Sequence, residues 1–573
     1  MKKVAKHFKR YLKETILAPL FKLCEATLEL IVPLVIASII DKGIGRSDTG
    51  YIVSMCLVLV VLGVAGLALS LTAQYFAAKS AVGVTTSLKQ TLFKHIQSFS
   101  YKDIDSLGTS TIITRMTTDA TRVQSGINLT LRLLLRSPFV VFGAMIMAFS
   151  IDVESGFRFA VVIPLLAIVV FGVMLLTTPI YKKSQSYLDK LMLRTRENLS
   201  GVRVVRAFAK ENDEIKEFDE ENNLFTEWQK KAGHISALLN PLTYVIINIG
   251  ILVLIYTGAV KVDSGVLTQG EVIALYNYMS QILVELIKLA NLIITISKAL
   301  ASLGRINSVI DTETTQVFGE LAEHNENYEY IVEIKGASLR YNESADNALS
   351  NINLKVKKGE TVGIIGATGS GKTSLVNLIP RLYDATEGNV LLYGNDISKY
   401  SKEFISSKIG IMPQKAVLFS GSIRDNLLWR KKDATDEELL QAVQTAQGND
   451  VIIAKGGLDA RIETEGKNLS GGQRQRLTIA RAIVGSPDIL IMDDSASALD
   501  FATDANLRKS IRTLCGDTTV FIVSQRASSV MFADKIVVLD DGRVSDIGTH
   551  NDLLSRSEIY REIYKTQFEE VTG

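Results

Sequence analysis

Three long stretches without a charged residue constrain this chain more than any other feature. They cover residues 51–78, 159–181 and 238–260. A helix needs about 20 apolar residues to cross the hydrocarbon core of a membrane, and each stretch is long enough. Buried core helices of a large soluble protein are the alternative, but those are shorter and carry a polar face. We therefore expect membrane-spanning helices.

Three further apolar stretches carry a few charges and bring the expected number of spans to six. The spans lie near 16–40, 51–78, 129–151, 159–181, 238–260 and 272–297, in a membrane domain of residues 1–310. The charges in or beside the interrupted spans are Lys22, Glu25, Glu29, Arg132, Arg136, Glu285 and Lys288. Such groups face a wet cavity or one another. We expect Glu285 to pair with Lys288, whereas Glu25 and Glu29 fit either a headgroup position or, for Glu29, contact with a cationic cargo.

Lysine and arginine are distributed unevenly around these spans. The first 13 residues and the long connections near 80–126 and 182–231 are rich in both, whereas the short connections 151–157 and 261–270 hold few near the span ends. Positive charge near span ends favours the cytoplasmic side. We expect both termini in the cytoplasm, helices that extend well beyond the membrane, and an amphipathic surface helix over residues 1–14 instead of a cleaved signal.

The chain becomes polar after the last span. Residues 311–330 are typical of a linker, and residues 331–573 alternate short apolar runs with helical patterns, as in an α/β domain. The whole chain has 63 Lys and Arg against 61 Asp and Glu, which argues against a broad nucleic-acid-binding surface. Its three cysteines are too few for a disulfide framework or a zinc site.

A phosphate-binding loop follows an apolar strand in this domain. Residues 366–373 read Gly-Ala-Thr-Gly-Ser-Gly-Lys-Thr, directly after Val-Gly-Ile-Ile and before a helical pattern. Glycines let backbone N–H groups face phosphates, Lys372 reaches the β- and γ-phosphates, and the Thr373 hydroxyl suits Mg²⁺. A second apolar strand, 489–492, ends in Asp493 and Asp494. Paired acids after a strand can be a solvated loop, but beside a phosphate loop Asp493 is expected to hold the metal.

The sequence resembles the ATP-binding-cassette (ABC) transporters, because further motifs follow in the family's order. Residues 469–476 match the signature, which in the family closes over ATP held by the opposite subunit; Gln414 matches the Q-loop; Ser497-Ala-Leu-Asp500 matches the D-loop; Tyr341 matches the aromatic that stacks on adenine. Alone, Tyr341 could pack in a core, Gln414 could cap a turn, and Ser470 could cap a helix. The resemblance covers nearly the whole chain and implies a six-helix membrane domain followed by an α/β P-loop ATPase domain.

The resemblance also implies the ligands and their residues. ATP and Mg²⁺ are the expected ligands, and the expected metal residues are Thr373, Gln414 and Asp493. The residues expected at ATP are Tyr341, Gly366, Thr368, Gly369, Ser370, Gly371, Lys372, Thr373, Ser374, Gln414, Ser470, Gly471, Gly472, Gln473 and Asp500. Turns near 106–116 and 206–214 correspond to the short helices that rest on the ATPase domains.

Two positions depart from the family pattern. Asp494 stands where most members have the Glu that activates the attacking water, and Gln525 stands where most have a His that contacts the γ-phosphate. A carboxylate that is one methylene shorter sits about 1.5 Å back, and glutamine carries no charge at neutral pH. Neutral drift in a working enzyme is one explanation. We expect instead a site that binds Mg-ATP but hydrolyses it slowly.

The expected protein is therefore one subunit of an ATP-driven exporter in the cytoplasmic membrane. It resembles the degenerate-site half of bacterial heterodimeric multidrug exporters, in contact with membrane lipids, a hydrophobic or cationic small molecule, a non-identical partner subunit and no nucleic acid. An ATP-gated regulatory or channel-like subunit and a homodimeric lipid or drug exporter with slow hydrolysis are the alternatives. The sequence does not name the cargo.

Overall fold

The computed structural model describes residues 2–324, 326–342, 346–494, 501–514 and 516–568. The chain divides into two compact units. The first, here called the helical unit, comprises Met1–Gln97 and Thr109–Glu313. The second, here called the α/β unit, comprises Ser98–Gly108 and Thr314–Gly573. Residues 98–108 therefore group with the α/β unit, although their sequence neighbours belong to the helical unit.

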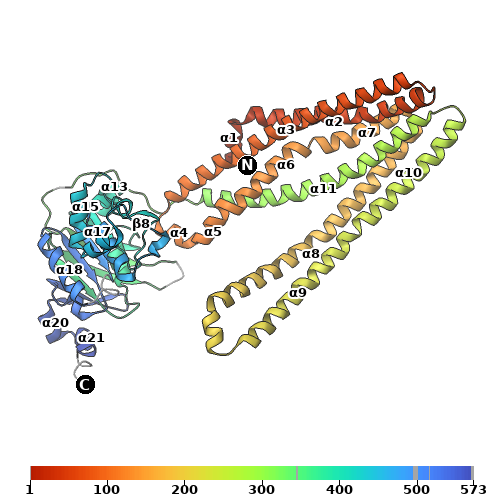
Figure 1. Ribbon diagram of the computed structural model, residues 1–573. Coiled ribbons are helices and arrows are strands. Elements are labelled where there is room, and N and C mark those ends of the chain that lie inside the picture. The colour runs from red at the N-terminus through yellow and green to blue at the C-terminus, as the bar shows by residue number, and fades with distance from the viewer. Residues whose placement is uncertain (1, 325, 343–345, 495–500, 515, 569–573) are drawn as a thin grey trace. The chain divides into compact units, whose positions relative to one another are not determined.

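The helical unit consists of long helices joined by short turns (Figure 1). Its helices are α1 (Lys2–Lys9), α2 (Leu12–Ser38), a π-helical segment (Ile39–Ile44), α3 (Thr49–Gln97), α5 (Thr109–Thr114), a second π-helical segment (Arg115–Asp119), α6 (Ala120–Leu133), α7 (Arg136–Ile151), α8 (Val153–Ala207), α9 (Glu211–Ala237), α10 (Leu239–Asp263) and α11 (Gln269–Asp311). In the part of the chain that the structure describes, six helical stretches are long and apolar enough to cross a membrane: Leu12–Ile44, Thr49–Gln97, Thr109–Ile151, Val153–Ala207, Glu211–Asp263 and Gln269–Asp311.

Many apolar side chains of these helices are not covered by the chain itself. The most apolar 18-residue stretch of Thr49–Gln97 buries none of its residues within the unit. A soluble protein rarely leaves such an apolar surface in water. Lipid or another protein chain must cover it, which agrees with the expected membrane domain.

Charged side chains inside the helical unit are paired across helices. Arg136, at the start of α7, forms ion pairs with Glu29 of α2 and Glu285 of α11. The expected pair is present, since Lys288 Nζ lies 2.8 Å from Glu285 Oε1, and the Ser137 hydroxyl donates to Glu285 Oε2 at 2.8 Å. Three helices distant in sequence are thus joined by one network around the buried Arg136 and Glu285, in which both acids, Glu29 and Glu285, have a cationic partner.

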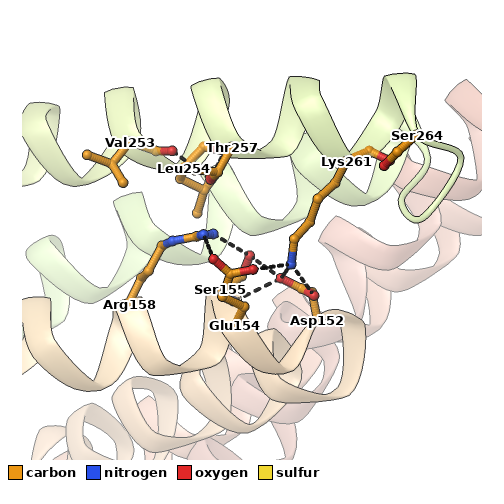
Figure 2. A network of polar contacts seen from close by, with 9 residues as sticks. All are labelled: Asp152, Glu154, Ser155, Arg158, Val253, Leu254, Thr257, Lys261 and Ser264. Atoms are coloured by element: carbon orange, nitrogen blue, oxygen red, sulfur yellow. Dashed lines mark hydrogen bonds and ion pairs between the residues drawn. The ribbon is translucent and has the colours of Figure 1, made fainter.

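A second polar network joins the start of α8 to the end of α10 (Figure 2). Asp152 caps α8 by accepting from the backbone N–H of Ser155 at 2.9 Å. Lys261 Nζ donates to both Asp152 carboxylate oxygens at 2.8 and 2.9 Å and pairs with Glu154 at 2.8 Å. Arg158 reaches Glu154 and Ser155 from the next turn (Figure 2). This network ties the two helices together at the short-connection end.

The α/β unit is built around a six-stranded sheet of order β12-β11-β3-β10-β9-β6. All neighbouring strands are parallel except β11 and β12. The strands of the unit are β1 (Val332–Leu339), β2 (Leu349–Val356), β3 (Thr361–Ile365), β4 (Glu387–Leu392), β5 (Asn395–Asp396), β6 (Ile409–Met412), β7 (Gly421–Ser422), β8 (Arg461–Ile462), β9 (Ile489–Asp493), β10 (Thr519–Val523), β11 (Lys535–Asp540) and β12 (Arg543–Gly548). A four-stranded antiparallel sheet, β2-β1-β4-β5, and a two-stranded sheet, β7-β8, complete the unit.

Buried side chains of the main sheet belong to two hydrophobic clusters, one shared with helices such as α17 and α19 and the other with α12 and the antiparallel sheet. The helices of the unit are α4 (Tyr101–Leu107), α12 (Lys372–Leu378), α13 (Lys402–Lys408), α14 (Ile423–Leu427), α15 (Asp436–Thr445), α16 (Asn449–Lys455), α17 (Gly471–Ile483), α18 (Phe501–Leu514), α19 (Ala527–Val530), α20 (His550–Arg556) and α21 (Glu558–Phe568). All five residues of β9 and of β10 are buried. This explains why these strands appear in the sequence as continuous apolar runs.

Short helix α4 belongs to the α/β unit through specific contacts. Asp103 accepts from the hydroxyl of Thr315 at 2.9 Å, and the Tyr383 hydroxyl donates to Asp105 at 2.6 Å. Ser100 and Asp103 form a capping box that starts the helix, and Gly108, with φ +76°, ends it. The helix therefore lies mostly before the turn expected near 106–116, because these capping residues set its ends.

Candidate nucleotide-binding site

A cavity of about 350 Å³ opens at the carboxyl ends of the central strands of the α/β unit. Strands β3, β10 and β9 are neighbours in the sheet, and ligands of open α/β sheets bind beyond the carboxyl ends of such strands. The cavity is lined by Tyr341, Ala348, Thr368, Gly369, Gly371, Lys372, Thr373, Ser374, Gln414, Asp493, Asp494, Val523, Ser524 and Gln525. Residues from five separate sequence motifs are thus gathered in one place: Tyr341, the phosphate loop, Gln414, the acids after β9, and Gln525.

The loop after β3 has the shape of a phosphate cradle. Gly369 and Gly371 have φ values of +86° and +93°, which side-chain-bearing residues rarely adopt. A Cβ atom at Gly371 would also lie 2.7 Å from the carbonyl oxygen of Ala348. Lys372 Nζ donates to the carbonyl oxygens of Gly366 and Ala367 at 2.9 and 2.6 Å, so its ammonium group lies over the loop.

Thr373 and Asp493 form an oxygen-rich corner of the cavity. The Thr373 hydroxyl donates to Asp493 Oδ1 at 3.2 Å, and Gln414 lines the same cavity. Hydroxyl, carboxylate and amide oxygens suit Mg²⁺, which takes few protein ligands and completes its shell with phosphate and water. Among the described residues, no cluster of three or more His, Cys, Asp or Glu side chains could hold a metal alone. The donor set therefore fits Mg²⁺ bound together with a nucleotide.

Burial shifts the pKa values of the ionisable groups in this corner. Asp493 is 5% exposed, and burial, together with the neighbouring Asp494 carboxylate, raises its pKa. Burial also raises the pKa of Asp494 and lowers that of Lys372. Each shift opposes the charged form of its group. A bound cation beside Asp493 and phosphates beside Lys372 would favour the charged forms again.

Asp494 and Gln525 lie on the same cavity wall as Asp493. Asp494 follows β9 in a left-handed turn with φ +50°, and its backbone N–H donates to the carbonyl of Val523 at 3.0 Å. Gln525 follows β10, and its Oε1 accepts from the Thr368 hydroxyl at 3.5 Å. A neutral glutamine and a short carboxylate therefore occupy the two positions at which the resemblance implies residues that act in ATP hydrolysis.

Tyr341 lies at the edge of the cavity. Its hydroxyl is 2.8 Å from the hydroxyl of Ser374, and its ring meets that of Tyr383 edge-on, with centroids 5.0 Å apart. These contacts fix an aromatic ring at the mouth of the phosphate site, where a base could stack on it. Ser370, also expected here, is buried in the loop and is not among the cavity-lining residues.

The signature residues do not line this cavity. Ser470 is the N-cap of α17 and forms a capping box with Gln473, with bonds of 3.3 and 3.0 Å. Ser470 therefore caps a helix in the structure, as one of the two interpretations of the sequence expected. The next residue, Gly471, is exposed. Asp500 and the rest of the expected D-loop lie outside the described residues.

Two residues near the site are not among those expected there. Gln475 of α17 donates to the backbone carbonyl of Asp494 at 3.3 Å, and Gln567 of α21 contacts the loop around Gln525. Gln475 lies within the 469–476 signature match, whereas Gln567 belongs to no motif. Only the tertiary structure brings them to the site.

Comparison with known proteins agrees with this architecture. Residues 15–286 match the family model of the ABC transporter transmembrane region, and residues 349–497 match the ABC transporter family model. An uncharacterized ABC transporter ATP-binding protein of Bacillus subtilis (strain 168) is 34% identical over 99% of both chains. An ATP-dependent lipid A-core flippase of Syntrophus aciditrophicus (strain SB) is 30% identical over 85% of this chain and 81% of its own.

Two further matches concern function and fold. A second Bacillus subtilis (strain 168) protein, whose name proposes multidrug export, is 28% identical over 99% of both chains. The structure of a bacterial Atm1-family ABC exporter with ATP bound aligns with a TM-score of 0.80 over 98% of both chains at 21% identity, which shows a shared fold. The six apolar helical stretches, the α/β domain and its cavity agree with these matches, and the chain belongs to the ABC transporter family as an exporter half-transporter with an ATP-hydrolysing domain.

Proposed function

We propose that this chain is one subunit of an ATP-driven exporter whose own cavity binds ATP firmly and hydrolyses it slowly. A non-identical partner subunit supplies the faster site. The observation that carries the proposal is the composition of one cavity: Lys372, Thr373 and Asp493 are retained, while Asp494 and Gln525 replace the usual Glu and His beside them. Binding and hydrolysis depend on different members of this set.

Each retained side chain has a defined task toward ATP. Lys372 would move from the loop carbonyls to the β- and γ-phosphates, because an ammonium gains more from phosphate than from neutral carbonyls. The Thr373 hydroxyl, Asp493 and Gln414 would hold Mg²⁺, which when bound neutralises phosphate charge. Tyr341 would stack on the adenine base. These contacts require no general base.

The two replaced side chains limit the reaction. A water attacking the terminal phosphate needs a carboxylate at hydrogen-bond distance, and the Asp494 side chain is about 1.5 Å shorter than that of a glutamate. Gln525 can donate a hydrogen bond to the γ-phosphate but cannot carry positive charge at neutral pH. Both changes act on the transition state more than on bound ATP.

The intact signature residues give this chain a second task. Ser470, Gly471, Gly472 and Gln473 would close over ATP held by the partner subunit, whose own Glu and His complete the fast site. ATP binding would favour the state in which the two ATPase domains are in contact, as a population shift. We infer that both termini and the α/β unit are cytoplasmic, from the lysine- and arginine-rich long connections.

The cargo is proposed as a drug or another amphipathic compound. Relatives named for multidrug export and for lipid A-core flipping support an amphipathic substrate class. The uncovered apolar helices of the helical unit are consistent with access from the membrane.

Reconstitution with candidate partners tests this proposal. Proteoliposomes holding both subunits should accumulate a fluorescent amphipathic cation in an ATP-dependent manner, and removing the partner's catalytic carboxylate should abolish accumulation. Removing the corresponding carboxylate of this chain by Asp494→Asn should leave most transport intact. A stable homodimer of this chain with brisk ATPase activity, or an ATP-gated conductance without accumulation, would contradict the proposal.

A further inference from the structure

The last described turn of α21 contacts the loop that carries Gln525. Gln567 Nε2 donates to the backbone carbonyl of Gln525 at 2.7 Å. The backbone N–H of Ala527 donates to Gln567 Oε1 at 2.8 Å. One side-chain amide therefore bridges two peptide groups on either side of Arg526.

Only one orientation of this amide satisfies both peptide groups. The carbonyl of Gln525 needs a donor and the N–H of Ala527 needs an acceptor, so the amide nitrogen must face the first and the oxygen the second. Ala527 is the first residue of α19, where a backbone N–H has no partner within its own helix. Gln567 thus caps α19 from another helix and fixes the loop before it.

Helix α21 is a firm support for this contact. Tyr560 is fully buried, and its hydroxyl lies 2.8 Å from His550 Nδ1. Ile563 and Tyr564 pack against the hydrophobic core of the unit. Because the first turns of α21 are held in the core, the position of Gln567 is set independently of the loop that it grips.

The gripped loop leads directly into the nucleotide cavity. The Ser524 N–H donates to the carbonyl of Ile364 at 3.1 Å at the end of β3, and the Gln525 side chain contacts Thr368 of the phosphate loop at 3.5 Å. The backbone of Gln525 is therefore held from behind by Gln567, while its side chain faces the cavity.

We propose that Gln567 is a positioning residue that sets the reach of the Gln525 side chain toward the terminal phosphate of ATP. This inference rests on the proposed role of Gln525. ADP lacks the terminal phosphate, so a loose Gln525 loop weakens ATP binding and leaves ADP binding unchanged. General damage to the site would weaken both nucleotides together.

Two substitutions of Gln567 test its hydrogen bonds to Gln525 and Ala527 separately from the packing of α21. Gln567→Glu is nearly isosteric and can still accept from Ala527, but its carboxylate cannot donate to the carbonyl of Gln525 and repels it. Gln567→Ala removes both bonds. Lys565→Gln is the matched control, because Lys565 is exposed in the same last turn.

The test measures equilibrium binding of ATP and of ADP, each with Mg²⁺, to the full-length chain in lipid nanodiscs. Both Gln567 variants should weaken ATP binding about tenfold, the order expected for one hydrogen bond to a charged group. Their ADP binding and both affinities of Lys565→Gln should stay within about twofold of the unmodified chain.

A double-mutant cycle with Gln525→Ala decides the mechanism. If Gln525→Ala weakens ATP binding and Gln567→Glu then adds nothing, the positioning role is supported. If Gln525→Ala weakens ATP binding but the Gln567 variants leave it unchanged or weaken ADP equally, the inference is overturned and the role of Gln525 stands. If Gln525→Ala itself spares ATP binding, the role proposed for Gln525 fails, and this inference fails with it.

Discussion

Two sides of one cavity differ in what they retain. The phosphate side, formed by Lys372, Thr373 and Asp493, keeps the side chains that the family uses for the phosphates and Mg²⁺. On the hydrolysis side, Asp494 is shorter than the usual glutamate and Gln525 lacks the charge that the usual histidine can carry. The two sides meet between consecutive residues. Asp493 is the buried last residue of β9, and Asp494 has a left-handed backbone conformation. Two adjacent residues can therefore serve different steps, one in binding Mg-ATP and the other in its hydrolysis.

Removing the phosphate side should have the largest effect. Lys372→Ala should weaken ATP binding about 100-fold, because the phosphate loop loses its cation for the phosphates. Equilibrium binding of ATP to the full-length chain checks this. Lys358→Ala is the control, since this lysine is 51% exposed in the same unit and lies outside the cavity. Equal loss in both variants would mean that Lys372 has no specific role.

Repairing the hydrolysis side should have the next largest effect. Asp494→Glu combined with Gln525→His should raise ATP turnover in the assembled transporter roughly 10- to 100-fold at this site, because a misplacement near 1 Å costs about that much. ATP affinity should change little. The left-handed backbone conformation at position 494 favours Asp over Glu. A melting curve of the variant therefore serves as the control that it is still folded. Unchanged turnover in a folded variant would refute the assignment of these two positions.

The charge distribution around Asp493 predicts a smaller, pH-dependent effect. Mg²⁺ needs the ionised carboxylate, and burial raises the pKa of Asp493. Mg²⁺ should therefore stop strengthening ATP binding as the pH falls. The loss should begin at a higher pH than for an ordinary aspartate, whose pKa is about 3.9. Binding of ATP with and without Mg²⁺ over a pH series measures this.

Asp494→Asn sharpens the same experiment. The Asp494 carboxylate contributes to the raised pKa of Asp493, so its neutralisation should move the midpoint to lower pH. A midpoint that does not move would mean that the two acids are electrostatically independent.

The smallest predicted effect concerns the edge of the phosphate side. Tyr341→Phe keeps the ring for adenine and removes only the bond between its hydroxyl and that of Ser374. ATP binding should weaken less than about fivefold, since one neutral hydrogen bond contributes about 1 kcal/mol or less. Tyr341→Ala should weaken it more. Equal effects of both variants would show that the ring does not contact the base.

The sequence alone predicts much of this architecture. Uncharged runs predict the membrane helices because a hydrocarbon core tolerates little else. The phosphate loop and Asp493 are predictable because each is a local pattern at the end of a strand. The pairing of Lys288 with Glu285 follows from helical spacing, and the structure confirms it.

Other features depend on contacts between residues far apart in the chain. Arg136 and Glu285 are 149 positions apart, and no local pattern links them. Residues Ser98–Gly108 group with the α/β unit because Tyr383 binds Asp105, which is 278 positions away. Gln567 has no motif, and its role depends on where α21 packs. Local periodicity contains no information on such pairings.

A single-turnover experiment decides whether this site holds ATP without hydrolysing it quickly. The full-length chain, assembled in lipid nanodiscs with a partner subunit whose catalytic carboxylate has been removed, is loaded with one equivalent of γ-labelled Mg-ATP, and phosphate release is followed over time. Nearly all labelled ATP should stay bound and intact for many minutes, and the Asp494→Glu, Gln525→His variant should release phosphate much sooner. Prompt release by the unmodified chain, at the rate of the double variant, would contradict the account.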